Sequence, residues 1–167
     1  MKEKHISQLF ERYYSDLILY GLGLTKNQKI AEELVSDAFY KLLLNIESVE
    51  LNRCKFWLMR VMKNSYIDRF RKDRKLTFYD EADRLPAHEV NGLEEVLQEE
   101  RRRELMEAIQ QLPGIYGEVM ILYYFLELDG KEIASYLRLT AGQVRTRLYR
   151  GRLLLKERLE GNGKKGV

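Results

Sequence analysis

LPGIYGEVMILYYFLELDGKEIASYLRLTAGQVRTRLYRGRLLLKERL, residues 112–159, decides how this chain folds and gives the first indication of its partner. An apolar helix is followed by a short helix (KEIASYL, 131–137), a tight turn at 138–140 and a helix rich in arginine. That order is typical of a helix-turn-helix, whose second helix enters the DNA major groove. The stretch therefore predicts an all-α domain and makes nucleic acid the first partner to test.

The second helix of this pair has a predicted start and two predicted faces. Thr140 and Gln143 form a capping-box pattern, so the helix is expected to begin at Ala141. One face is expected to dock on the core: Val144, Leu148, Gly151, Leu155 and Leu159. The outward side carries the candidates for DNA contact: Gln143, Arg145, Thr146, Arg147 and Arg150. Arginine can read guanine and glutamine can read adenine. The alternative is a solvated basic helix in which Gln143 serves only the cap.

Charge is segregated along the chain although the net charge is only +3 over 167 residues. Residues 53–75 hold nine basic and two acidic side chains, and residues 138–167 hold the same numbers. Between them, residues 76–100 hold eight acidic side chains and one basic side chain. The near-neutral total therefore hides two candidate phosphate-binding surfaces.

Several classes of protein are not expected from the composition. Cys54 is the single cysteine, which excludes an internal disulfide, and with only two histidines a structural zinc site is not expected. We expect no metal and no cofactor, and no catalytic motif points to an enzyme. The N-terminus lacks a signal-peptide core, and no apolar run approaches the roughly 18 residues of a spanning helix. These patterns predict a cytoplasmic protein with no membrane insertion.

Helical periodicity predicts the remaining organisation. Helices are expected over 4–24, over 28–45 with Asn27 as its cap, and over 54–74, with a loop at 48–53. Periodicity is lost over 76–98, where acidic residues surround Pro86 and Gly92. It resumes over 93–111 and 115–127. The sequence thus predicts an all-α protein of two small helical domains, 1–75 and 99–167, joined by a flexible acidic linker, 76–98.

Two further surfaces are candidates for binding. On the helix over 54–74, Phe56, Met59, Met62, Tyr66 and Phe70 share one face. Arg60, Asn64 and Arg71 share another, with Trp57 beside them and Lys63 adding charge. Cations with stacking aromatics suit single-stranded DNA, although Tyr66 and Phe70 are better explained as core. On the helix over 28–45, Glu33, Asp37 and Tyr40 form either a protein-docking patch or an ordinary solvated face, and spacing alone favours the second.

Together these blocks resemble a known family. The segments AEELVSDAFYKLLLN (31–45) and FWLMRVMKNSYIDRFRKDRK (56–75), followed by the helix-turn-helix stretch, resemble a bacterial RNA polymerase sigma factor. The short, two-domain form resembles the extracytoplasmic-function (ECF) group. The resemblance covers roughly residues 5–160 of the sequence.

The resemblance implies a division of labour. The N-terminal domain would bind the β′ clamp of core RNA polymerase, with Asp37 at the acidic docking position beside Glu33 and Tyr40, and would open the minus-10 promoter element. Asn64 matches a position that captures a flipped base, and Trp57 and Arg60 match the same strand-opening helix. The C-terminal domain would read the minus-35 element and touch the β flap, with Arg145, Thr146, Tyr149 and Arg150 at matching positions. An anti-sigma factor is the implied regulator.

Two other functions remain open. An autonomous helix-turn-helix regulator would need no polymerase, but a second basic and aromatic helix at 54–74 has no use in a simple repressor. A helical adaptor that touches no nucleic acid is disfavoured because charge is segregated into two blocks.

Overall fold

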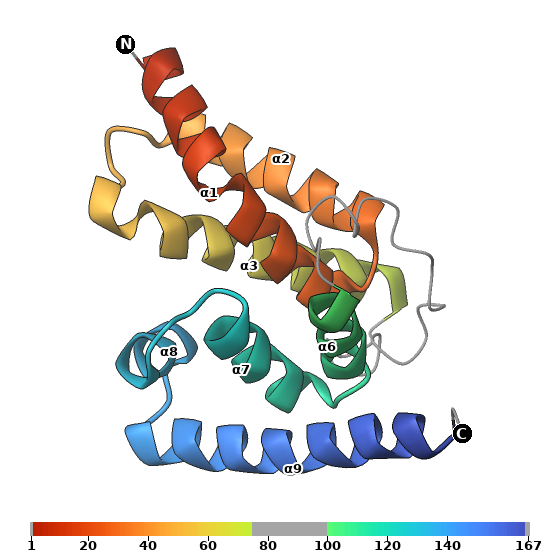
Figure 1. Cartoon of the computed structure of the whole chain (residues 1–167). Coiled ribbons are helices and arrows are strands. Elements are labelled where there is room, and N and C mark those ends of the chain that lie inside the picture. Colours follow the sequence, from red (N-terminus) through yellow and green to blue (C-terminus); the bar gives the residue numbers. More distant parts are fainter. Residues whose placement is uncertain (1, 75–99, 166–167) are drawn as a thin grey trace. The chain divides into compact units, whose positions relative to one another are not determined.

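The computed structural model describes residues 2–74 and 100–165, with side chains described over 4–69 and 100–161. Every regular element in these ranges is a helix, which confirms the all-α class. The chain divides into two units, Met1–Gly92 and Leu93–Val167 (Figure 1). The linker expected at 76–98 lies outside the described residues.

Three helices build the N-terminal unit: α1 (Lys2–Thr25), α2 (Gln28–Leu44) and α3 (Cys54–Arg74). They pack against one another in pairs around one apolar core (Figure 1). The fully buried side chains include Leu17, Ile18, Tyr20 and Leu22 of α1, Leu42 of α2, and Leu58, Met59, Met62 and Tyr66 of α3. Each buried aliphatic side chain stabilises the fold by about 1.5–3 kcal/mol. The core role expected for Tyr66 is confirmed, and Met59 and Met62 on the same face are buried with it, whereas Phe56 is half-buried. The side chain of Phe70 lies outside the described residues.

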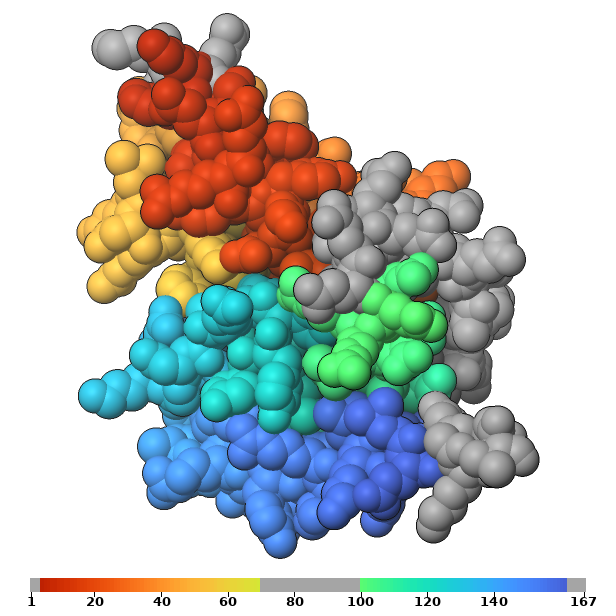
Figure 2. Space-filling view, viewed as in Figure 1, coloured from red at the N-terminus to blue at the C-terminus, as the bar shows by residue number. Residues whose placement is uncertain are grey.

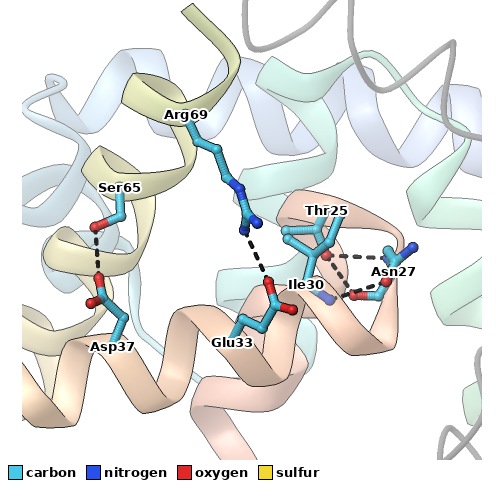
Figure 3. Close-up of polar contacts among 7 residues, drawn as sticks. All are labelled: Thr25, Asn27, Ile30, Glu33, Asp37, Ser65 and Arg69. Atoms are coloured by element: carbon cyan, nitrogen blue, oxygen red, sulfur yellow. Dashed lines mark hydrogen bonds and ion pairs between the residues drawn. The ribbon is translucent and has the colours of Figure 1, made fainter. Parts of the chain in front are cut away.

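The turn between α1 and α2 is fixed by side chains. Lys26 adopts a left-handed conformation with φ 58°. The amide of Asn27 then donates to Oγ1 of Thr25 at 3.2 Å, and the amide of Ile30 donates to Oδ1 of Asn27 at 3.0 Å (Figure 3). Asn27 is therefore the N-cap of α2, as the sequence predicts.

The start of α3 is anchored to α1. Lys55 Nζ lies 2.6 Å from Asp16 Oδ2 in a partly buried ion pair. Cys54 is buried, and this burial raises the pKa of its thiol. The loop expected at 48–53 is not wholly irregular, because its last three residues form a 3-10 turn, η1 (Leu51–Arg53), that leads into α3.

Four helices build the C-terminal unit: α6 (Glu100–Gln110), α7 (Gly114–Tyr124), α8 (Gly130–Leu137) and α9 (Ala141–Lys165). Their buried side chains include Met106 and Ile109 of α6, Val119, Met120 and Leu122 of α7, Ile133 and Tyr136 of α8, and Val144, Leu148 and Leu155 of α9. In the space-filling view the side chains of residues 141–161 form an outer layer of this unit (Figure 2).

The prediction for the end of α7 was wrong by three residues. The helix ends at Tyr124 rather than at residue 127. The chain leaves the helix through Glu127, which adopts a left-handed conformation with φ 55°. The amide of Leu128 then donates to the carbonyl of Leu122 at 3.0 Å. No glycine marks this turn, so the sequence shows no stop signal there.

Candidate nucleic-acid interface

The first helix of the helix-turn-helix, α8, begins with a complete capping box. The amide of Glu132 donates to Oδ1 of Asp129 at 2.8 Å, and the amide of Asp129 donates to Oε1 of Glu132 at 3.1 Å. Sequence reasoning missed this cap, because Asp129-Gly130 has the composition of a plain turn. The signal is nevertheless present, since Asp followed by Glu three residues later fits the capping-box pattern.

The turn between the two helices is held by backbone contacts. Arg138 is the C-cap of α8 and adopts a left-handed conformation with φ 57°. Both its own amide and that of Leu139 donate to the carbonyl of Ala134. This closes α8 and turns the chain directly into α9.

The second capping box, at the start of α9, matches the sequence prediction. The amide of Gln143 donates to Oγ1 of Thr140 at 3.1 Å, and the amide of Thr140 donates to Oε1 of Gln143 at 2.9 Å. The side-chain oxygen of Gln143, Oε1, is therefore used in the cap. Its amide nitrogen is the part of this exposed side chain that remains to donate to a base edge.

The two faces of α9 separate as expected. Val144, Leu148 and Leu155 are buried against the unit, and a Cβ placed on Gly151 would lie 3.1 Å from Sδ of Met120. The outward side exposes the minus-35 candidates Gln143, Arg145, Thr146, Tyr149 and Arg150, while Arg147 is half-buried. Arg145–Tyr149 and Thr146–Arg150 are spaced four residues apart, so they lie as neighbours on the exposed face.

The core role predicted for Leu159 was wrong. Its side chain is 41% exposed, and residues 156–160 are all exposed. Leu155 is the last buried side chain described on α9. Helical spacing identified the correct face of the helix but carried no information about where the neighbouring helices end.

Two arginines of α9 are held by side chains elsewhere in the unit and so are less available to DNA. Arg152 Nε donates to the hydroxyl of Tyr124 at 2.9 Å, and its guanidinium lies 5.2 Å from the ring centroid of Tyr123. The hydrogen bond with Tyr124 raises the pKa of Arg152. Arg158 donates to Oε1 of Gln111 at 2.7 Å. Arg145 and Arg150, by contrast, are exposed on the outward side of the first turns of α9.

The side chains of the second candidate surface, on α3, are only partly exposed. Asn64 is exposed, and Trp57, Arg60 and Lys63 are half-buried. Arg71 falls within α3, but its side chain lies outside the described residues. The exposed amide of Asn64 gives this helix a group that can donate to and accept from a base.

The docking candidates on α2 are exposed and are tied to neighbouring charges. Glu33 pairs with Arg69 of α3, with Oε2 and NH1 3.1 Å apart (Figure 3). Asp37 pairs with Lys41 at 3.1 Å, and the hydroxyl of Ser65 lies 3.5 Å from the same carboxylate. Tyr40 is 60% exposed. The charges available to a partner on this face are therefore already partly neutralised within the chain.

Sequence reasoning missed an apolar extension of this face. Leu43 and Leu44 are 39% and 65% exposed. They lie three and four residues after Tyr40, which places all three side chains on one side of α2. Leu42, by contrast, is fully buried. The signal was the run Leu42-Leu43-Leu44, because three consecutive residues of a helix cannot all face one core.

No metal centre accompanies these surfaces in the described parts of the chain, where no three His, Cys, Asp or Glu side chains group as ligands would. None of the described helices combines the length and apolarity that crossing a membrane requires.

Comparison with known proteins identifies both units. Residues 9–76 match the family model "Sigma-70 region 2", and residues 102–155 match "Sigma-70, region 4". The chain is 34% identical over 142 residues to the ECF RNA polymerase sigma factor SigW of Bacillus subtilis, covering 77% of this chain and 75% of SigW. It is 29% identical over 160 residues to the ECF sigma factor SigM of the same organism, covering 90% of this chain and 93% of SigM.

A solved structure shows the same fold. The sigma factor RpoE, determined in complex with the anti-sigma factor NepR from Bartonella quintana, superposes with a TM-score of 0.72. The match covers 94% of this chain and 98% of that one at 20% identity. Since the two sigma-70 regions occur in order on two helical units, and the region 4 unit carries a capped helix-turn-helix, the chain belongs to the ECF RNA polymerase sigma factors and directs transcription initiation by RNA polymerase.

Proposed function

We propose that the two domains divide the work of promoter recognition, with residues 1–75 and 99–167 as the working units and 76–98 as the linker between them. The N-terminal domain docks on the β′ clamp of core polymerase through Glu33, Asp37 and Tyr40. It then opens the minus-10 element with Trp57, Arg60, Lys63, Asn64 and Arg71. The C-terminal domain reads the minus-35 element as duplex and contacts the β flap. Like other sigma factors, the chain is a non-enzymatic initiation factor.

The exposed first turns of α9 carry this proposal. Gln143, Arg145, Thr146, Tyr149 and Arg150 are all exposed, while the opposite side of the same turns is buried through Val144 and Leu148. The capping box at Thr140 fixes where the helix begins, so the register of these side chains is set before DNA binds. Such a preorganised helix N-terminus is the part of a helix-turn-helix that enters the major groove.

A second surface on the same chain supports a role within polymerase. The exposed amide of Asn64 lies on α3, in the unit that carries the apolar and acidic face of α2. A side chain that holds an extruded base must offset an unstacking cost of a few kcal/mol. A duplex-reading regulator has no need for such a side chain, which favours the polymerase-dependent function over an autonomous regulator.

The direct test is co-purification of the tagged chain with core polymerase, followed by mapping of transcription starts with the reconstituted holoenzyme. We expect the isolated chain to bind duplex promoter weakly and to gain specificity only with core polymerase. Tight and specific footprints from the isolated chain would support the autonomous regulator instead.

An anti-sigma factor is part of the proposal, supported by the fold shared with a sigma factor that was crystallised with one. The partner should co-elute with the tagged chain and should suppress transcription by the reconstituted holoenzyme when added back. The proposal also implies a cytoplasmic location, because promoter DNA and polymerase are found there.

A further inference from the structure

The ion pair between Glu33 and Arg69 joins two surfaces with different proposed roles. Glu33 belongs to the docking face of α2, and Arg69 belongs to α3, the proposed strand-opening helix. Figure 3 shows the guanidinium extending from α3 toward the Glu33 carboxylate, at an NH1–Oε2 distance of 3.1 Å. From this geometry we infer that Arg69 is a further DNA-contacting residue, which Glu33 withholds until a cationic partner surface pairs with Glu33.

The guanidinium is open to solvent as well as paired. The side chains of Arg69 and Glu33 are 51% and 46% exposed. A guanidinium carries five N–H donors, and the pair with Glu33 involves only one terminal nitrogen. A phosphate group therefore has physical access to Arg69 in the folded chain.

The neighbouring carboxylate opposes that contact. A phosphate that approaches Arg69 also approaches Glu33, and two like charges about 4 Å apart repel enough, even in water, to lower affinity about fivefold. As long as Arg69 is the cation that pairs with Glu33, the two side chains together present little net charge to DNA. A cation supplied to Glu33 by another protein removes the repulsion and makes Arg69 a full phosphate ligand.

The neighbouring acidic residue does not carry the same link. Asp37 is neutralised by Lys41 on its own helix at 3.1 Å, and its contact with α3 is the 3.5 Å approach of the Ser65 hydroxyl. A partner that neutralises Asp37 thus frees a cation on α2, whereas one that neutralises Glu33 frees a cation on α3.

Thermodynamic linkage makes the coupling reciprocal. If pairing of Glu33 with a partner strengthens DNA binding at Arg69, then DNA at Arg69 strengthens partner binding at Glu33 by the same factor. The inference rests on the proposed function only for the identity of that partner, core polymerase. The withholding of Arg69 by Glu33 is a property of the free chain and is testable without polymerase.

The test measures fluorescence anisotropy of a labelled single-stranded oligonucleotide of mixed sequence with the full chain at low salt. The repulsion that Glu33 exerts on a phosphate at Arg69 corresponds to about fivefold in affinity for charges surrounded by water. Glu33→Gln should therefore tighten binding about fivefold more than Glu32→Gln. The control removes one negative charge from the adjacent exposed residue, whose carboxylate accepts from Gln28 rather than from a cation. Glu33→Gln should also steepen the slope of log K against log salt by about 0.7.

Combining Glu33→Gln with a substitution of Arg69 decides the role of Arg69. Arg69→Gln alone should change affinity little, and in the Glu33→Gln background it should abolish the gain, whereas Arg69→Lys in that background should keep most of it. Circular dichroism and Trp57 fluorescence verify that each variant is folded. Equal affinities for Glu33→Gln and Glu32→Gln, or a gain that survives Arg69→Gln, would overturn the inference.

Co-purification of the same variants with core polymerase keeps the two proposals separate. Loss of core binding in Glu33→Gln without the oligonucleotide pattern would refute the withholding of Arg69 and leave the docking role intact. The oligonucleotide pattern with unchanged core binding would refute the docking role of Glu33 and leave the withholding intact.

Discussion

Gly21 of α1 packs directly against Ala31 of α2, and a Cβ placed on Gly21 would lie 2.9 Å from Cβ of Ala31 and 3.3 Å from its Cα. Backbone atoms cannot move aside as a flexible side chain can. We predict that Gly21→Ala destabilises the N-terminal unit by about 1–3 kcal/mol through overpacking, despite the helix-propensity gain of about 1 kcal/mol. Fluorescence of the single tryptophan, Trp57, during denaturant unfolding reports on this unit.

Gly161→Ala is the matched control for this substitution. Gly161 lies within α9, and nothing approaches within 4 Å of a Cβ placed there. The same change there should show only the propensity gain, monitored by helical circular dichroism. A Gly21→Ala variant as stable as the parent chain would show that α1 and α2 separate without cost.

Arg138→Gly should stabilise the C-terminal unit by about 0.5–1 kcal/mol. Arg138 has a left-handed backbone conformation, which is strained for every residue that has a Cβ atom and is unstrained for glycine. The glycine variant relieves this strain and keeps the backbone amide that closes α8. Arg138→Ala is the control, since it removes the cation but keeps the Cβ. Thermal unfolding followed by circular dichroism compares the three chains. A stabilisation shared by the alanine variant would implicate charge rather than backbone strain.

Local patterns explain why most of the fold was predictable. The bounds of α3 coincide with those expected, and the caps at Asn27 and Thr140 depend on residues within three positions of each other. The capping box at Asp129 is equally local, although its Asp-Gly pair is also typical of a plain turn. The end of α7 could not be predicted from the sequence, because Glu127 adopts a left-handed backbone conformation that glutamate disfavours.

The candidate sites were predictable only as faces. Spacing placed Asn64 and Arg150 on exposed sides of their helices, and both are exposed. It could not show that Glu33 pairs with Arg69, 36 residues away, or that Arg152 is held by Tyr124. Such partners depend on how one helix is positioned against another, and the period of a single helix contains no information about that.

Gln143→Glu should separate capping from DNA reading. A glutamate oxygen can accept from the amide of Thr140 as the glutamine oxygen does, and a carboxylate near a helix N-terminus is favourable. Stability should therefore stay within about 0.5 kcal/mol of the parent chain. The variant loses the side-chain donor and adds a negative charge facing DNA, so affinity for minus-35 duplex in the holoenzyme should fall by about 1–3 kcal/mol.

Gln143→Ala provides the comparison, because it removes the cap and the donor together and should lower both stability and affinity. If Gln143→Glu retained full affinity for the duplex, Gln143 would serve the helix cap alone.

Arg150→Ala should weaken minus-35 recognition by about 1–3 kcal/mol for each base that the guanidinium no longer reads. Arg150 is exposed one turn beyond Thr146, on the face proposed to enter the groove. Lys156→Ala removes an exposed cation farther along the same helix, which pairs with Glu160 at 3.9 Å. That control should change affinity less and equally on all sequences, as expected for a distant charge. Footprints of the two holoenzymes that cannot be told apart would refute the assignment of Arg150.

Asn64→Ala should impair opening of the promoter more than its initial binding. Extrusion of a base costs a few kcal/mol of unstacking free energy, which the holoenzyme recovers only if a side chain holds the flipped base. The exposed amide of Asn64 can supply both donors and acceptors to such a base. The holoenzyme with Asn64→Ala should therefore bind promoter duplex normally but show reduced permanganate reactivity of unpaired thymines. Asn52→Ala, at an exposed asparagine of η1, controls for loss of an amide elsewhere in the unit. Permanganate reactivity equal to that of the parent holoenzyme would remove Asn64 from the strand-opening step.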